Sequence, residues 1–485
     1  MILYDTPMRR LPGRVWHSPT LTTWGSLAVR LASVVLVLPL VLSRYDAPEV
    51  AVWQLFSVLF TLALLFDFGL APTFARLLAY ARGGASVAQM AAPAAQAPAA
   101  LASATMSTEG AMAVLATQRW LYARLAVATT LVVAVLGSLA LAHPIAQTTD
   151  PRNAWAAWGV VLLTLGIGFW GNGFGAALQG MDRIALLRRW EMGCGLAQVL
   201  SSAAVLLAGG DLLALVASYQ FWVVFNALRN RRLMQREFPA LMATAPHADR
   251  AVLRVMWPAT WRSGVGVLMS QGVVQTSGVV YSQFAAPADV AAYLLALRII
   301  TVVGQFSQAP FYSKLPQLAK LHVAQQRPAQ LALAQRGMRM AHWTFVAGAA
   351  AVALALPSVL AAIGSRVAFV APDVWAVMCL AFFAERFGAM HLQLYSVTNH
   401  IVWHIANGVT GVVMIGLALL LYPLVGLMAL PANMLLAYAG FYCVYSFVKS
   451  SRAFGFTLAG FEPGVSLGPV LVLAGVVTGA ALWAR

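Results

Sequence analysis

The chain has 485 residues, of which 61% are hydrophobic and only 9% are charged. A water-soluble protein of this size could not bury so much apolar side-chain surface, so the composition excludes an ordinary soluble domain. The formal net charge of +16 comes from basic residues between the apolar runs, and without a polar basic domain to carry it we expect no nucleic acid as a partner.

Apolar runs long enough to cross a bilayer recur along the whole chain. A spanning helix needs about 20 residues, and in lipid such a continuous run must be helical to satisfy its own backbone. We therefore predict an all-α polytopic membrane protein with about 12 transmembrane helices, or 13–14 at most. The predicted spans are 21–43, 51–80, 119–142, 155–179, 190–208, 211–228, 252–281, 289–312, 340–363, 372–398, 401–422 and 428–448.

The N-terminal segment 1–20 carries Arg9, Arg10 and Arg14 ahead of the first span. That span is too long for the apolar region of a signal peptide, so we expect a first transmembrane helix that starts in the cytoplasm. The bacterial inner membrane is the predicted location, with the protein crossing it many times.

The loops suggest how the chain is divided. An N-lobe is expected over 21–228, with an Ala-rich cytoplasmic loop at 83–118. A cytoplasmic linker, 229–251, leads to a C-lobe over 252–448. The C-terminal segment 449–485 contains a thirteenth apolar run, 465–484, which would place the C-terminus outside the cytoplasm.

The second half of the chain weakly repeats the first. The sequence TWGS at Thr23 returns as TWRS at Thr260, 237 residues later, and APTFAR at Ala71 returns as APFYSK at Ala309, 238 residues later. An offset of six helices gives both halves the same orientation. Two pseudo-symmetric six-helix lobes around a central cavity are therefore expected, which is a transporter architecture.

Arginines near the middle of predicted spans are the first candidate site residues. An ionised group at that depth costs about 2.5–3.5 kcal/mol even on lenient insertion scales, so it normally faces a protein interior or water. Arg30 and Arg298 lie on polar helix faces, whereas Arg262 points away from the polar face of its helix. We predict that Arg30 and Arg298 face the cavity.

Polar stripes on the seventh and eighth spans extend this candidate site. Gln271 and Gln275 share one face of the seventh span, and Gln305 and Gln308 share the face of Arg298 on the eighth. Interhelical hydrogen bonding would also explain such glutamines. The candidate substrate-binding set is Arg30, Arg298, Gln305, Gln308, Gln271, Gln275, Arg76 and Lys314.

Arg76 and Lys314 occupy equivalent positions of the repeat near the cytoplasmic ends of their helices, where long side chains can also reach the interface. Two deep acids, Asp67 and Glu385, are candidates for ion coupling with H+ or Na+, and either could instead neutralise an arginine. Glu191 follows two arginines and is expected at the interface.

No pattern points to catalysis or to a metal. His400 and His404 have an i, i+4 spacing, but HIVWH lacks the glutamate of a zinc-protease motif. The three cysteines lie in apolar runs without metal-like spacing. The expectation is a protein that is not an enzyme, with no cofactor and no metal.

Several segments resemble one family. DFGLAPTFARLLAYARGGA, LQGMDRI, WPATWRSGV and AAYLLALRIITVVGQFSQAPFYSKLPQLAKL are similar to segments of bacterial polysaccharide (O-antigen and exopolysaccharide repeat-unit) flippases of the Wzx type. These belong to the multidrug/oligosaccharidyl-lipid/polysaccharide (MOP) exporter superfamily. The resemblance covers most of residues 20–450, while the Ala-rich stretch and the thirteenth apolar run depart from it.

The resemblance implies a function in polysaccharide and lipopolysaccharide biosynthesis. Undecaprenyl-diphosphate-linked oligosaccharide would be flipped from the cytoplasmic to the periplasmic leaflet by alternating access, driven by an ion gradient, within membrane lipid. It also implies a cationic cavity, which matches Arg30 and Arg298, an arginine after the proline of the second helix, which matches Arg76, and polysaccharide polymerase and chain-length proteins as partners.

Two other functions remain open from the sequence. A multidrug and cation antiporter of the MATE type would share the fold but would need an acidic cavity. A membrane polysaccharide polymerase or ligase, from a different class, would need a substantial extracytoplasmic loop with catalytic groups. The segment GMDRIALLRR resembles a major-facilitator loop motif, but its spacing and its position after the fourth helix do not fit.

Overall fold

The computed structural model describes residues 36–90, 107–398, 400 and 402–483. Within these ranges the regular secondary structure is helical, as the composition predicted. The helices divide into two compact units. Unit 1 holds residues up to Tyr45 and Phe66–Trp261, and unit 2 holds Asp46–Leu65 and Arg262 onward.

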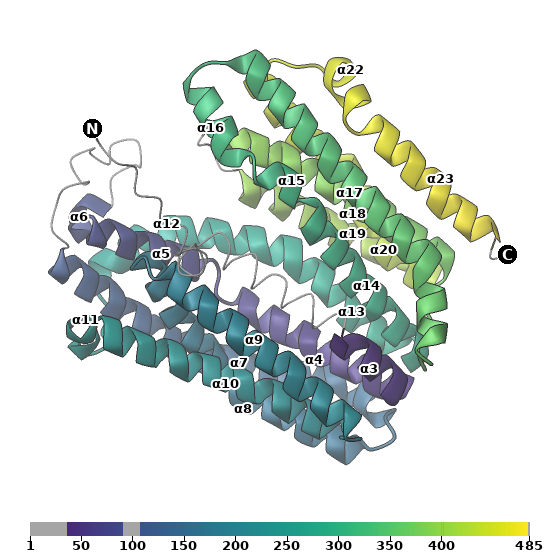
Figure 1. Cartoon of the computed structure of the whole chain (residues 1–485), viewed down its shortest axis with the longest axis horizontal. Helices are drawn as coiled ribbons and strands as arrows, with labels where there is room; N and C mark the ends of the chain where they lie inside the picture. The colour runs from purple at the N-terminus through teal and green to yellow at the C-terminus, as the bar shows by residue number, and fades with distance from the viewer. Residues whose placement is uncertain (1–35, 91–106, 399, 401, 484–485) are drawn as a thin grey trace, which may run out of the picture. The chain divides into compact units, whose positions relative to one another are not determined.

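Unit 1 is built around long helices that run side by side in Figure 1. Its helices are α3 (Leu38–Arg44), α5 (Leu70–Arg82), α6 (Val87–Met90), α7 (Thr108–Ala146), α8 (Pro151–Gly180), α9 (Ile184–Leu207), α10 (Leu212–Glu237), α11 (Pro239–Ala243) and the first part of α12 (Arg250–Val267).

Helix starts in unit 1 follow from local sequence. Ser107, Asp150 and Asp211 each accept a hydrogen bond from a backbone N–H in the first turn of α7, α8 and α10. Asn153 also donates to Asp211 at 2.6 Å, which joins the starts of α8 and α10. These capping contacts fix the ends of the apolar helices.

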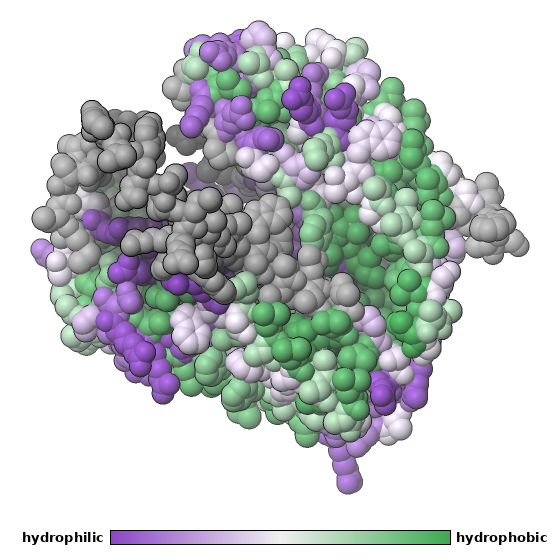
Figure 2. All heavy atoms as spheres, in the orientation of Figure 1, coloured by the Kyte–Doolittle hydropathy of each residue, from purple (hydrophilic) through white to green (hydrophobic). Residues whose placement is uncertain are grey.

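The flank of α7 shows how the helices meet lipid. Val127, Leu131, Val135 and Leu139 recur every four residues, and each is at least 60% exposed. Hydrophobic residues cover the middle of the unit 1 helices in Figure 2, and hydrophilic residues gather towards their ends. A wide apolar flank with polar ends is typical of a membrane-spanning bundle.

Unit 2 contains α4 (Ala47–Leu65) and the helices that follow Trp261. These are the π-helical turn η4 (Leu268–Gly272), α13 (Val273–Phe284), α14 (Pro287–Ser307), α15 (Ala309–Tyr312), α16 (Leu315–Val323), α17 (Arg327–Ala362), α18 (Pro372–Ser396), α19 (Trp403–Val425), the 3-10 turn η5 (Gly426–Met428), α20 (Ala429–Ala437), the π-helical turn η6 (Tyr438–Tyr442), α21 (Cys443–Phe454), α22 (Leu458–Phe461), the 3-10 turn η7 (Glu462–Gly464) and α23 (Leu467–Trp483).

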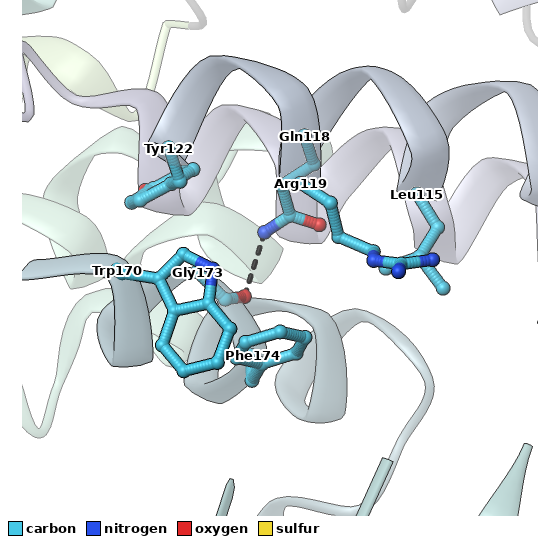
Figure 3. A pocket seen from close by; sticks show the side chains of 7 residues that line it. All are labelled: Leu115, Gln118, Arg119, Tyr122, Trp170, Gly173 and Phe174. Atoms are coloured by element: carbon cyan, nitrogen blue, oxygen red, sulfur yellow. Dashed lines mark hydrogen bonds between the residues drawn. The ribbon is translucent and has the colours of Figure 1, made fainter. Parts of the chain in front are cut away.

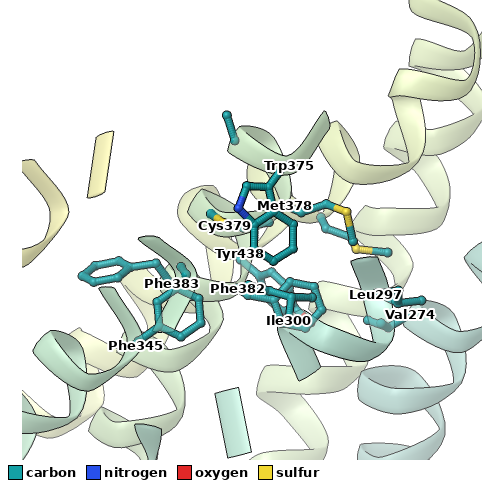
Figure 4. Packing of buried hydrophobic residues seen from close by; sticks show 14 of the residues in the cluster. Val274, Leu297, Ile300, Phe345, Trp375, Met378, Cys379, Phe382, Phe383 and Tyr438 are labelled. Atoms are coloured by element: carbon teal, nitrogen blue, oxygen red, sulfur yellow. The ribbon is translucent and has the colours of Figure 1, made fainter. Parts of the chain in front are cut away.

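The core of unit 2 centres on α18. Figure 4 shows Trp375, Met378 and Phe382 of α18 packed with Ile300 of α14 and Tyr438 of η6. Two further helix pairs complete this unit, since α23 packs along α17 and α18 and can be followed beside α17 in Figure 1. Burial of α18 from several sides explains why the polar groups it carries must have partners.

Nine described helices are long and apolar enough to cross a membrane, or ten if the bent pair of α22–η7 and α23 counts as one span. The expectation was about 12. The predicted first span lies mostly outside the described residues, and the predicted span 252–281, which α12 begins with three arginines in its length, is not among the nine. The range Trp403–Phe454 counts once but covers two predicted spans.

The second predicted span, 51–80, is not one continuous helix. It is interrupted at 66–69, where Phe68 and Gly69 have positive φ angles of 48° and 75°, so α4 ends and α5 begins. The left-handed conformation at Gly69 costs little because glycine has no Cβ. Apolarity alone predicted the span but could not reveal this break.

The interruption recurs in the second half. Helix α14 ends at Ser307 and α15 begins at Ala309, and Ala309 is the repeat equivalent of Ala71 at the start of α5. In both halves a proline follows one residue later, at Pro72 and Pro310. The two breaks at the same repeat position show that the repeat extends to local structure.

Candidate functional site

Arg298 lies on α14, and its guanidinium carbon is 5.1 Å from the ring centroid of Trp53 on α4. The two helices pack together, and the buried Gln54 of α4 donates to the carbonyl of Ala291 at 3.2 Å. A cation held over an indole face is stabilised by about 0.5–2 kcal/mol. Trp53 therefore fixes a candidate arginine, a role that the sequence did not predict.

The predicted stripe of α14 is partly open and partly engaged. Gln305 is exposed, whereas Thr301 turns its hydroxyl back to the carbonyl of Leu297 at 2.7 Å. Gln308 is half-buried, and its Oε1 accepts a hydrogen bond from Arg386 on α18 at 3.0 Å. The stripe thus joins a second arginine about 15 Å along the helix from Arg298.

Arg386 is a site residue that the sequence interpretation missed. It is 7% exposed, and its Nη2 lies 2.8 Å from Oε2 of Glu385. Its Nε is buried and has no hydrogen-bond partner among the described residues. The available signal was an arginine in the middle of the predicted span 372–398, beside the glutamate that was selected.

Glu385, predicted to couple ion movement, forms an ion pair with Arg386 in the structure. The pair buries one positive and one negative group together, which lowers the desolvation cost of each. This contact matches the alternative in which the acid neutralises an arginine. Its part in coupling stays a prediction.

Asp67, the other predicted coupling acid, lies in unit 1 at the break before α5. Its Oδ2 accepts from the backbone N–H of Ala71 at 3.0 Å, and its Oδ1 accepts from the hydroxyl of the buried Tyr122 on α7. A carboxylate at the first turn of a helix also offsets the helix dipole. Asp67 therefore has a structural function at the break, and a coupling function remains a prediction.

The remaining predicted site residues are not gathered with Arg298. Arg76 and Lys314 are both exposed. Gln271 is exposed in the π-helical turn η4 and Gln275 is half-buried beyond it. A π turn inserts one residue, so the 100° spacing assumed for that stripe does not hold through it. Arg30 lies outside the described residues.

A small cavity in unit 1 lies between α7 and α8. Figure 3 shows Gln118, Arg119, Trp170 and Phe174 around it, and Gln118 donates to the carbonyl of Gly173 at 2.7 Å. Arg119 instead donates to the carbonyls of Met242 and Thr244 at 3.2 and 2.7 Å. The cavity has room for about one water molecule and cannot hold an oligosaccharide.

Neither a protein-family model nor a curated protein sequence matches this chain. Solved structures do. The lipid II flippase MurJ in an inward closed conformation is similar over 95% of this chain and 98% of that one, with 10% identity and a TM-score of 0.62.

Two multidrug transporters are also similar. An inward-facing multidrug resistance MATE family transporter of the MOP superfamily covers 88% of this chain and 98% of its own, with 13% identity and a TM-score of 0.57. The MATE multidrug transporter DinF-BH covers 93% and 99%, with 14% identity and a TM-score of 0.52. The chain is thus a multi-pass membrane protein with the fold of the MOP-superfamily transporters and flippases.

Proposed function

We propose that this protein flips undecaprenyl-diphosphate-linked oligosaccharide repeat units from the cytoplasmic to the periplasmic leaflet of the bacterial inner membrane. The transport step would proceed by alternating access and be driven by an ion gradient. The observation that carries the proposal is a polar stripe on α14 with a guanidinium group near each end, Arg298 over Trp53 and Arg386 against Gln308.

The chemistry of the substrate favours this arrangement. A diphosphate leaving water needs fixed cations and N–H donors to replace its hydration, and arginine supplies both in a planar array. The Nε–H of Arg386, which has no partner among the described residues, is a buried donor that an anionic oxygen could satisfy. The exposed Gln305 offers a neutral partner for sugar hydroxyls, while the lipid tail can remain in the bilayer.

The charges disfavour the cation antiporter. A cation site needs a carboxylate with spare capacity, but Glu385 is paired with Arg386, and Asp67 accepts from both Tyr122 and Ala71. The likeness to lipid II flippase supports a lipid-linked substrate only by analogy of fold. Polysaccharide polymerase and chain-length proteins are proposed as partners on the same analogy.

The proposal is tested by flipping in proteoliposomes and by lipid analysis of cells. Deletion of the gene should leave lipid-linked repeat units on the cytoplasmic side. In vesicles that contain a fluorescent undecaprenyl-diphosphate oligosaccharide, Arg298→Ala should slow flipping about 10- to 100-fold, because one charge-assisted contact worth about 1.5–3 kcal/mol is lost.

Arg366→Ala is the matched control. Arg366 pairs with Asp46 at 2.5 Å, and both side chains are about half exposed, so its loss should leave flipping unchanged. Flipping at the wild-type rate in Arg298→Ala would remove that residue from the mechanism. Transport of cationic dyes without any movement of the lipid-linked glycan would favour the multidrug antiporter instead.

A further inference from the structure

A second polar cluster lies inside unit 2 and is used by neither the stripe of α14 nor the predicted coupling acids. His391 of α18 is 1% exposed and Glu462 of η7 is 7% exposed, and Nε2 of the histidine is 3.1 Å from Oε1 of the glutamate. Two buried titratable groups in direct contact within a membrane domain are costly, so they call for a function.

Both groups have further partners. Ser466 donates to Oε2 of Glu462, and Oγ of Ser450 on α21 is 2.8 Å from Nδ1 of His391. Ser450 also has an acceptor of its own, the carbonyl of Phe447 at 3.1 Å. The chain Phe447–Ser450–His391–Glu462–Ser466 therefore links α21, α18 and the turn between α22 and α23.

This chain can hold either of two proton counts without breaking a contact. In the first arrangement the Ser450 hydroxyl donates to Nδ1 of His391, and Nε2–H donates to the Glu462 carboxylate, so the pair has a charge of −1. In the second the hydroxyl turns to Phe447, Nδ1–H donates to Ser450, and an added proton lies between Nε2 and Oε1.

The second arrangement needs that proton because Nε2 and Oε1 would otherwise face each other as two acceptors. It makes the pair neutral overall, which offsets the desolvation cost of the buried carboxylate. Rotation of one hydroxyl group thus converts the proton-free form into the proton-loaded form, with one proton taken up.

The surroundings isolate the pair from other charges but leave it near the candidate site. Rings of Phe387, Phe447, Phe456 and Phe461 lie within 6.1 Å of the His391 ring. Titratable or charged groups on the elements packed around α18 are His342 on α17, Arg298 on α14, Glu385 and Arg386 on α18 itself, Tyr438 and Tyr442 on η6, Cys443, Tyr445, Lys449 and Arg452 on α21, and Lys320 and His322 on α16.

The pair is also placed where a charge change can act on structure. The helices α22–η7 and α23 meet at a bend of 54°, and Glu462 and Ser466 lie at that bend. His342 of α17 reaches the carbonyl of Val465 there at 3.5 Å. Arg386 is five residues before His391, about 7.5 Å along the axis of α18.

We propose that the His391–Glu462 pair binds and releases the single proton that couples transport to the proton gradient. The proposal rests on the proposed flippase function and gives its driving ion a site. A change between −1 and neutral at the bend would alter the hold of α18 on α22–α23 during the cycle.

The test separates proton binding from transport. In titrations of the purified protein, Glu462→Gln and His391→Gln should each take up one proton fewer than the wild type between alkaline and acidic pH. In proteoliposomes, an imposed pH gradient should accelerate wild-type flipping, whereas both variants should flip at the same rate with and without the gradient.

His143→Gln is the control, because this histidine is exposed on α7 in unit 1 and should leave the gradient response intact. If the variants are poorly folded, Ser450→Ala keeps both titratable groups and should shift the pH at which the gradient response is half-maximal. A full gradient response in Glu462→Gln, or a wild-type pH profile in Ser450→Ala, would overturn the proposal.

Absence of glycan flipping in the wild-type protein would count against the proposed function alone. The proton titration would still decide the assignment of the pair, since it needs no substrate. A wild-type proton count in both Glu462→Gln and His391→Gln would contradict the proton site whatever the substrate is.

Discussion

Arg386 and Glu385 are adjacent in the sequence, and their side chains neutralise each other on a crowded helix. Arg386 is buried, while 24% of the Glu385 side chain is exposed. Such a pair adds little stability compared with apolar residues of the same size, but loss of one member leaves the other without compensation. The asymmetry between single and double substitution is therefore diagnostic.

We expect Arg386→Gln to lower the free energy of unfolding by about 1–3 kcal/mol, less than for a fully buried pair because Glu385 is partly solvated. The double variant Glu385→Gln with Arg386→Gln should be more stable than Arg386→Gln alone. Thermal unfolding of both variants in the same detergent measures the difference. A double variant less stable than Arg386→Gln would show that the two residues do not act as a pair.

The sequence predicted part of this site because an arginine or an acid inside an apolar run can be recognised directly. It could select Arg298, Gln308 and Glu385 from helical spacing. It could not find Trp53, whose ring is one of many, nor the contact between Arg386 and Gln308, which are 78 residues apart. Such partners depend on which helices pack together, and spacing within one helix does not contain that information.

Breaks within helices were the main feature that the apolar pattern could not predict. Hydropathy averages over a window and does not register a change of φ at two residues, so 51–80 appeared as one span. The clue was the acid–Phe–Gly sequence of Asp67, Phe68 and Gly69 followed by a proline. A carboxylate that accepts a backbone N–H and a glycine that adopts positive φ are the residues such a break requires.

Close packing between α8 and α10 gives a prediction at the scale of the element. A Cβ added to Gly171 would lie 2.3 Å from Cβ and 2.6 Å from Cα of Ala227. Because the second atom belongs to the backbone, rotation of a side chain cannot relieve the overlap. Gly171→Ala should cost about 1–3 kcal/mol of unfolding free energy, the usual range for an overpacked core.

Gly159 is the matched control on the same helix. A Cβ at Gly159 would meet nothing within 4 Å, so Gly159→Ala should be neutral or stabilise the helix by up to about 1 kcal/mol. Unfolding followed by tryptophan fluorescence compares the two variants. Equal stability of Gly171→Ala and Gly159→Ala would mean that the helices do not approach as closely as the structure has them.

At the scale of the whole molecule, the repeat explains why an even number of helices lies between equivalent segments. The break before α5 and the break before α15 occupy the same repeat position. Their flanking residues differ, since Asp67 corresponds to Gln305 by the offset of 238 residues. The same backbone device therefore carries an acid in one half and a neutral amide in the other, which allows the halves to take different functions.

The distribution of charge predicts how the chain crosses the membrane. Arg183, Arg188 and Arg189 follow α8, and with the rule that basic loops stay in the cytoplasm they place Asp182 inside and Asp150, before α8, outside. The same alternation places Gly464 inside and Trp483, at the end of α23, outside. The last assignment requires α23 to cross the bilayer despite the 54° bend that precedes it.

Single cysteines placed in a variant without Cys194, Cys379 and Cys443 test this arrangement. A thiol reagent that cannot cross the inner membrane should label Asp150→Cys and Trp483→Cys in intact cells. Asp182→Cys and Gly464→Cys should react only after permeabilisation. Labelling of Asp182→Cys in intact cells would reverse the orientation of the whole protein. Protection of Trp483→Cys, with the other three as expected, would mean that α23 does not reach the outer side, and the number of spans would then be even.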